Sequence, residues 1–252
     1  MEGNTMTGKL LKYDLKSMLR NFIPLWAALV AVSIINYFTL HSLDQAKGVA
    51  QLPAMVAMLV YGSLVVAVMV VTAVLVIQRF YQGLLKDEGY LMFTLPVQPW
   101  QLLTSKLAAA VIVCLGSCIV GGISVMVIAF DSETYLTMFD AIGMAFRLYP
   151  GPIVAGCLAA IASGLCTITQ IYVSLALGHL ASKHRIGWAV GIYIAIHMVF
   201  SWLELAVGIT MPVPLFQDAT SFLLILAAYY FLRAVLFFVV TERILSKKLN
   251  LE

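Results

Sequence analysis

The sequence predicts an all-α integral membrane protein with six transmembrane helices. Hydrophobic residues make up 62% of its 252 residues and charged residues 11%, and the mean hydropathy is +0.99. A soluble domain carries roughly 25% charged residues, so a bilayer is the better solvent for this composition. Six apolar stretches are each long enough to cross about 30 Å of hydrocarbon. We expect helices, because the alternating segments of about ten residues that mark a membrane barrel are absent.

The chain is expected to form one transmembrane domain, with external loops too short to fold separately. The six expected spans are 22–40, 52–78, 107–130, 152–181, 187–209 and 221–240. With both termini in the cytoplasm, twelve of the 15 Lys and Arg residues lie inside, only Lys47 and Arg147 lie outside, and Arg233 lies within a span. This bias predicts a multi-pass protein of the cell membrane with both termini cytoplasmic. The net charge of +3 then reflects orientation, and we expect no nucleic-acid partner.

The segment 7–21 before the first span predicts a basic amphipathic helix. Its apolar residues recur on one face and its cations lie on the other: Leu11, Leu15, Met18 and Phe22 against Lys9, Lys12, Lys16 and Arg20. Such a helix is suited to the cytoplasmic membrane interface. The alternative is a simple extension of the first span. Pro24 favours a break and a change of direction between the two.

The largest cytoplasmic element is the segment 84–106, between the second and third spans. Asp87 is a good helix N-cap, and Glu88 follows it in the first turn. The short helix predicted there carries exposed aromatic side chains and ends before Pro96, and Pro99 is suited to start a second helix that continues into the third span. Exposed aromatics favour docking on a partner protein. The alternative is packing against the chain's own spans.

This segment with its immediate neighbours, "RFYQGLLKDEGYLMFTLPVQPWQLLTSKL" (79–107), together with the six spans and the amphipathic N-terminal helix, resembles the ABC-2 type permease family of Gram-positive bacteria. The members of that family are membrane subunits of ATP-binding cassette exporters. The resemblance implies that 84–106 holds a coupling helix seated in a cleft of a separate ATPase subunit, contacted by Asp87, Glu88, Gly89, Tyr90 and Phe93. It also implies a dimer with a second copy or a homologous permease. Peptides and hydrophobic drug-like compounds are family-level substrates, between which the sequence does not distinguish.

Polar residues inside the spans are candidates for a translocation path. They form one stripe in the fourth span and another in the fifth: Ser163, Thr167, Gln170 and Ser174, then Tyr193, His197, Ser201 and Glu204. At 1.5 Å per residue, Gln170, His197 and Arg233 lie roughly 10–17 Å from the inner boundary and are expected to form one polar layer. Glu204 is expected roughly 25 Å from that boundary, too far to meet Arg233 easily unless the helices tilt or break. The alternative to a path is helix–helix packing, to which such groups contribute about 0.6 kcal/mol each.

No enzyme, metal site or cofactor is expected. The stretch "GNTMTGKL" resembles a phosphate-binding loop, but Leu10 stands where the motif needs a hydroxyl and no strand precedes it. ATP hydrolysis is therefore assigned to a partner subunit. The alternative function is an ATP-independent secondary transporter or channel.

Overall fold

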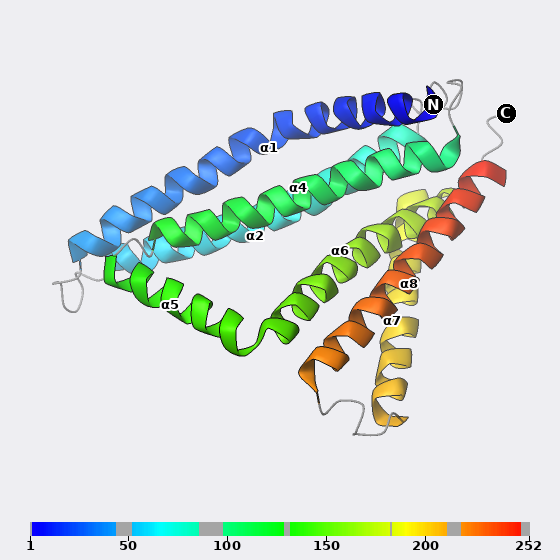
Figure 1. Cartoon of the computed structure of the whole chain (residues 1–252). Helices are drawn as coiled ribbons and strands as arrows, with labels where there is room; N and C mark the ends of the chain where they lie inside the picture. The colour runs from blue at the N-terminus through cyan, green and yellow to red at the C-terminus, as the bar shows by residue number, and fades with distance from the viewer. Residues whose placement is uncertain are drawn as a thin grey trace. The chain divides into compact units, whose positions relative to one another are not determined.

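The computed structural model describes residues 2–43, 52–85, 98–128, 132–181, 183–210 and 218–247, and within these ranges it contains helices and no strand (Figure 1). The helices are α1 (Glu2–Leu43), α2 (Leu52–Phe80), the π-helix η2 (Tyr81–Leu85), α4 (Pro99–Ile128), α5 (Ser132–Leu148), α6 (Pro150–His179), α7 (Arg185–Thr210) and α8 (Ala219–Lys247). All of them except η2 and α5 are long and apolar enough to cross a membrane. The predicted fold class is confirmed.

The chain forms two compact units. The first contains Met1–Val76 and Ala108–Met144, and the second contains Ile77–Leu107 and Ala145–Glu252. The second unit therefore includes both flanks of the expected coupling segment together with α6, α7 and α8.

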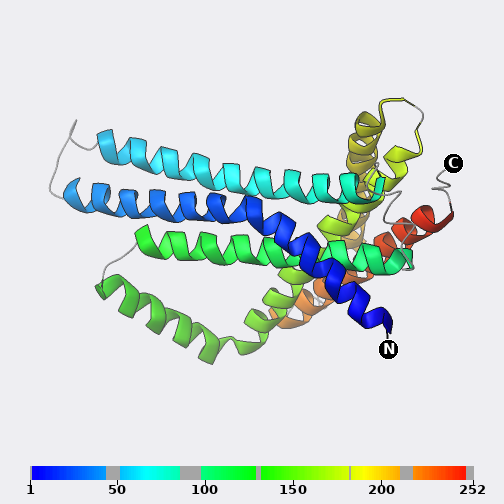
Figure 2. The same ribbon diagram turned by 90° about the horizontal axis from the view of Figure 1, so that it is seen from above.

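In the first unit, α1, α2 and α4 run side by side in both views (Figures 1 and 2). The indole Nε1–H of Trp26 on α1 donates to Ser117 Oγ on α4 at 3.1 Å. The hydroxyls of Tyr61 on α2 and Ser124 on α4 lie 2.7 Å apart. Gly116 leaves room for the indole, because a Cβ there would come within 2.7 Å of the Trp26 ring.

The N-terminal segment is part of α1 and does not form a separate helix. Its two faces are as expected, with Met18 and Phe22 buried and Lys12, Lys16 and Arg20 exposed. Pro24 lies inside the helix, and Figure 2 shows that α1 bends without interruption. A proline removes one helical hydrogen bond and bends a helix that tertiary contacts hold together. The break expected at Pro24 is therefore wrong, and the placement of 7–21 at the membrane interface stays a prediction.

The second external loop, expected at 131–151, is mostly the helix α5. Tyr135, Phe139, Ile142 and Phe146 recur at intervals of four, three and four residues. This is helical periodicity. The segment was interpreted as a loop because it connects two spans. The consequence is an additional amphipathic helix joined to α4 and α6.

In the second unit, α6 packs along α8 and against α7 (Figure 1). The core between α6 and α8 is formed by Cys166, Val173 and Ala176 facing Ala234, Phe237 and Ile244. The closest approach of α6 to α7 is at Gly178, where a Cβ would lie 2.6 Å from the Ala189 backbone. Small residues permit such approach between membrane helices.

Candidate functional site

A buried cluster of polar side chains joins α6, α7 and α8 around Arg233. Its Nη1 lies 2.9 Å from Glu204 Oε1 on α7, and its Nη2 donates to Gln170 Oε1 on α6 at 2.9 Å. Tyr229, one turn earlier on α8, donates its hydroxyl to the same Glu204 oxygen at 3.2 Å. The Arg233 side chain is 6% exposed and that of Glu204 is 37% exposed. The cluster thus holds a cation inside the unit and leaves its carboxylate partly open.

Aromatic rings complete the surroundings of the guanidinium. Its Cζ lies 4.0 Å from the centre of the Phe200 ring on α7 and 5.4 Å from that of Phe237 on α8. The two rings meet edge to face at 5.5 Å. Cation–π attraction of this kind strengthens when water is excluded. Arg233 therefore faces the interior of the helix bundle, next to Gln170.

Gln170 bonds to both neighbouring helices. Its amide oxygen accepts from Arg233, and its Nε2 lies 3.5 Å from the Tyr193 carbonyl of α7. The other polar residues of the α6 stripe donate hydrogen bonds to backbone carbonyls of their own helix. Thr167, for example, donates to the Ser163 carbonyl, and Ser174 donates to the Gln170 carbonyl. Gln170 is therefore the member of this stripe that links helices.

His197 is not part of the polar layer, contrary to expectation. It is exposed and stacks on Tyr193, with ring centres 6.2 Å apart. The inward face of α7 runs instead through Ala189, Ile196, Phe200 and Glu204. His197 follows Ile196 by one residue, a rotation of about 100° around the helix, which turns it away from α6 and α8.

Glu204 reaches Arg233, so the expected separation of the two is wrong. The expected depths were counted from assumed span ends, and α8 continues to Lys247, seven residues beyond the end assumed at 240. A depth counted along each helix therefore does not decide which side chains of two packed helices meet.

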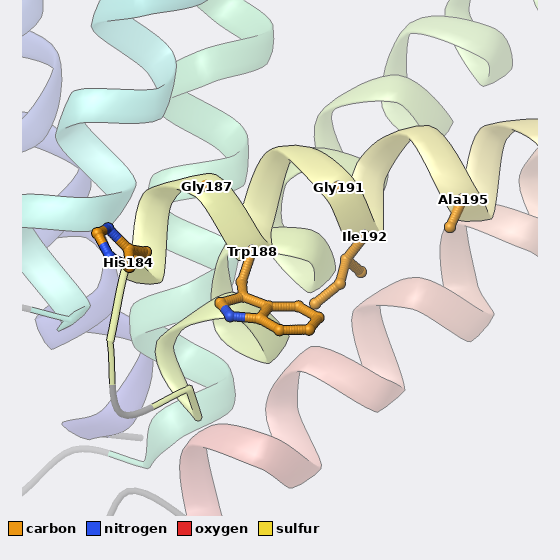
Figure 3. Close-up of a pocket in the computed structure, with 6 residues that line it drawn as sticks. All are labelled: His184, Gly187, Trp188, Gly191, Ile192 and Ala195. Atoms are coloured by element: carbon orange, nitrogen blue, oxygen red, sulfur yellow. The ribbon is translucent and has the colours of Figure 1, made fainter.

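The exposed side of α7 carries a shallow groove of about 450 Å³. The residues that line it come from the start of α7 and the residue before it: His184, Gly187, Trp188, Gly191, Ile192 and Ala195 (Figure 3). A Cβ on Gly191 would meet nothing within 4 Å. The small-residue pair Gly187 and Gly191, a candidate for close helix approach, is therefore not used for packing within the described chain.

Both flanks of the expected coupling segment pack on α6. Phe80, the last residue of α2, stacks on Tyr172 with ring centres 4.0 Å apart. On the other flank, the carbonyl of Lys106 accepts a hydrogen bond from the Tyr172 hydroxyl at 3.3 Å. The single residue Tyr172 thus touches both the chain just before the segment and the last residue of the segment.

The π-helix η2 packs against the side chain of Lys106. Gly83, Leu84 and Leu85 are buried in it, and Lys106 is 2% exposed. A Cβ at Gly83 would lie 2.5 Å from Lys106 Nζ. A π-turn inserts one extra residue into a helix and is often found at functional sites; here it brings the Gly83 backbone against a buried lysine.

The second flank begins as predicted, with Pro99 at the start of α4. The Gln98 backbone N–H donates to Gln101 Oε1 at 3.1 Å. This is the reciprocal half of a capping box, which satisfies a free donor at a helix start. The last part of the segment is therefore the capped start of a helix that continues into the third span.

The five residues expected to contact an ATPase, Asp87, Glu88, Gly89, Tyr90 and Phe93, lie outside the described residues. Of the candidate path residues, Gln170, Glu204 and Arg233 come together and His197 does not. Sequence reasoning missed Phe200, Tyr229 and Phe237. Each lies four residues from Glu204 or Arg233 on the same helix, and this i, i+4 spacing around a charged residue was the available signal.

A comparison with known proteins found no matching family model, no matching curated protein and no matching solved structure. The family resemblance therefore rests on the residues of the segment 84–106 and on the six apolar helices. Among the described residues, no group of three or more His, Cys, Asp or Glu is placed to hold a metal ion.

Proposed function

We propose that this protein is the membrane permease subunit of an ATP-binding cassette exporter of the ABC-2 type. A separate ATPase subunit would bind the segment 84–106 from the cytoplasm, with both chain termini on the same side of the cell membrane. A second copy or a homologous permease would complete the transporter. The exported compound would be a peptide or a hydrophobic drug-like molecule.

The observation that carries the proposal is the packing of both segment flanks on α6. A segment through which a partner protein moves transmembrane helices must contact those helices. Phe80 and Lys106 both contact Tyr172, so a displacement of 84–106 would act directly on α6. A loop that served only as a connection would not need the buried π-turn on one side and the buried Lys106 on the other.

One member of the polar cluster, Gln170, lies on the same helix as Tyr172, two residues before it. Gln170 and Arg233 are buried and bonded to each other, which favours a role in joining helices. Glu204 is the member whose carboxylate stays partly open. We therefore propose Glu204 as the cluster residue that a solute would reach, with Arg233 fixing its position.

The proposal is tested by replacing the two aromatic anchors, Tyr90→Ala with Phe93→Ala. Buried aromatic anchors at interfaces commonly cost 2 kcal/mol or more when truncated, or roughly a thirtyfold weaker association. The variant should remain folded and inserted, lose its ATPase partner in a pull-down, and lose ATP-dependent transport in vesicles. The matched control is Trp188→Ala with Trp202→Ala, two exposed aromatics of α7, which should retain the ATPase.

Two outcomes would contradict the proposal. If the double variant melts early in detergent yet binds the ATPase normally, the segment is internal packing. If vesicles move solute equally well without the ATPase, the protein is a secondary transporter or channel.

Orientation is tested separately with an impermeant thiol reagent applied to intact cells. Cysteines introduced at Lys47 or Asp140 should react, and a cysteine at Lys248 should not. Labelling at position 248 would overturn the arrangement with both termini inside.

A further inference from the structure

The helix α5 has two chemically distinct sides. Phe139, Ile142 and Phe146 recur at intervals of three and four residues and share one side. Asp140 and Arg147, seven residues apart, share the other. At about 100° per residue, the centres of the two groups lie well over a quarter-turn apart. Leu136 and Met144 are apolar exceptions on the charged side.

The apolar side of α5 is not covered by the described part of the chain. Phe139 is 61% exposed, Ile142 is 42% exposed and Phe146 is 53% exposed. Asp140 and Arg147 are exposed as well. An apolar helix face of this kind needs a partner that is itself apolar.

The position of α5 in the chain restricts what that partner can be. It is joined to α4 by the three residues 129–131 and to α6 by Tyr149. Three residues span at most roughly 11 Å, so both ends of α5 stay near the ends of two spans at one membrane surface. With 17 residues it is shorter than the roughly 20 apolar residues of a spanning helix, and it carries charges.

The end of α4 and the start of α6, to which α5 is joined, each carry exposed apolar side chains. Val125 and Met126 near the end of α4, and Val154 near the start of α6, are exposed apolar side chains on helices apolar enough to span a membrane. The Tyr135 hydroxyl of α5 donates to the Met126 carbonyl in the last turn of α4. Tyrosine is enriched at membrane–water boundaries, and here it fixes the start of α5 to the end of a span.

We propose that α5 lies in the plane of the membrane interface, with Phe139, Ile142 and Phe146 among lipid acyl chains and Asp140 and Arg147 toward water. The lipid is the occupant because α5 is joined directly to the ends of two helices that are apolar enough to span a membrane, and because its length and charges keep α5 itself from crossing. This inference does not depend on the transport function.

The test uses site-directed spin labels on the full-length chain in vesicles of phosphatidylethanolamine and phosphatidylglycerol. The four cysteines, Cys114, Cys118, Cys157 and Cys166, are first replaced by alanine. Single cysteines are then labelled at 139, 142 and 146, and at 140 and 147. Power saturation with oxygen and with a water-soluble nickel chelate reports the depth of each label. Leu232, exposed in the middle of α8, gives the lipid reference, and Lys183, exposed between α6 and α7, gives the water reference.

Labels at 139, 142 and 146 should be accessible to oxygen and protected from nickel, at roughly 5–10 Å below the headgroup boundary. Labels at 140 and 147 should show the reverse. Protection of 139, 142 and 146 from both reagents would mean that protein covers this side, either another part of the chain or a second copy. Nickel access at all five positions would mean that α5 stands in water. Either result overturns the proposal. As a control for folding, the melting temperature of each labelled variant should equal that of the unlabelled parent.

Discussion

The helices α6 and α7 carry similar polar stripes but use them differently. Within the most apolar 18 residues of each helix, 28% are buried in α6 and 6% in α7. On α6, Gln170 and Ser174 are buried; on α7, His197 and Ser201 are exposed, and Glu204 is the stripe residue whose side chain bonds to the cluster. A polar residue in a membrane helix is therefore informative only when the face on which it lies is known. The buried residues of each helix, more than its polar ones, identify that face.

The strongest test of this difference compares two arginines of α8. Arg233→Met leaves the Glu204 carboxylate without its cation. Losing one partner of a buried ion pair costs 3–5 kcal/mol, and the partial exposure of Glu204 places the expected loss of unfolding free energy at about 3 kcal/mol. Arg243→Met, at an exposed position, is the control and should change little. Unfolding in mixed detergent micelles measures both, and equal stabilities would mean that the cluster contributes nothing.

A second comparison uses the glycines of α6 and α7. Gly178→Ala would push a methyl group into the Ala189 backbone, and such overpacking costs roughly 1–3 kcal/mol. Gly191→Ala faces the open groove and should be neutral or stabilise the helix by up to about 1 kcal/mol. Thermal melting of the two variants checks the prediction. If Gly191→Ala instead weakens association of the protein with itself, the groove is an interface between copies.

The two stripes are compared directly by Gln170→Leu and His197→Leu. Gln170 loses bonds to α7 and α8, and the expected cost is about 1 kcal/mol, within the range of hydrogen bonds between membrane helices. His197 makes only a ring contact with its own helix, so its replacement should leave stability unchanged. A larger loss for His197 than for Gln170, in the same unfolding assay, would reverse the assignment of the two faces.

The smallest expected effect lies outside the membrane, at the start of α8. The Thr220 backbone N–H and the Ser221 hydroxyl donate to the Asp218 carboxylate at 3.3 and 3.1 Å and lower its pKa. Because the folded-state pKa is lowered, the stabilisation is present above the unfolded-state value of about 4 and is lost as the pH falls through the folded-state pKa.

Asp218→Asn keeps a capping oxygen but does not titrate. Its melting temperature, measured against wild type between pH 7 and pH 3, should lie slightly below the wild-type value at neutral pH and approach it in acid. A constant difference across this range would show that the carboxylate charge has no part in the cap.

The sequence predicts the architecture well because span length and apolarity are strong signals. All six spans are present, and Pro99 begins α4 as expected. The bounds were less accurate, and the position of Glu204 relative to Arg233 was wrong because it was counted from assumed span ends. His197 was misplaced because a stripe of polar residues does not define the inward face. Phe80 and Tyr172 are far apart in sequence, and nothing in a local pattern indicates that they stack.

The pairing of Arg233 with Glu204 has a consequence for biosynthesis. When α8 leaves the ribosome, a lone arginine at its centre would oppose insertion by about 2.5–3.5 kcal/mol. Its carboxylate partner lies on α7, which is synthesised immediately before. We therefore expect α7 and α8 to enter the bilayer as a hairpin, the two charges neutralising each other on entry. In a glycosylation-mapping assay, α8 alone should insert poorly, Arg233→Leu should restore it, and the α7–α8 pair should insert efficiently only while Glu204 is present.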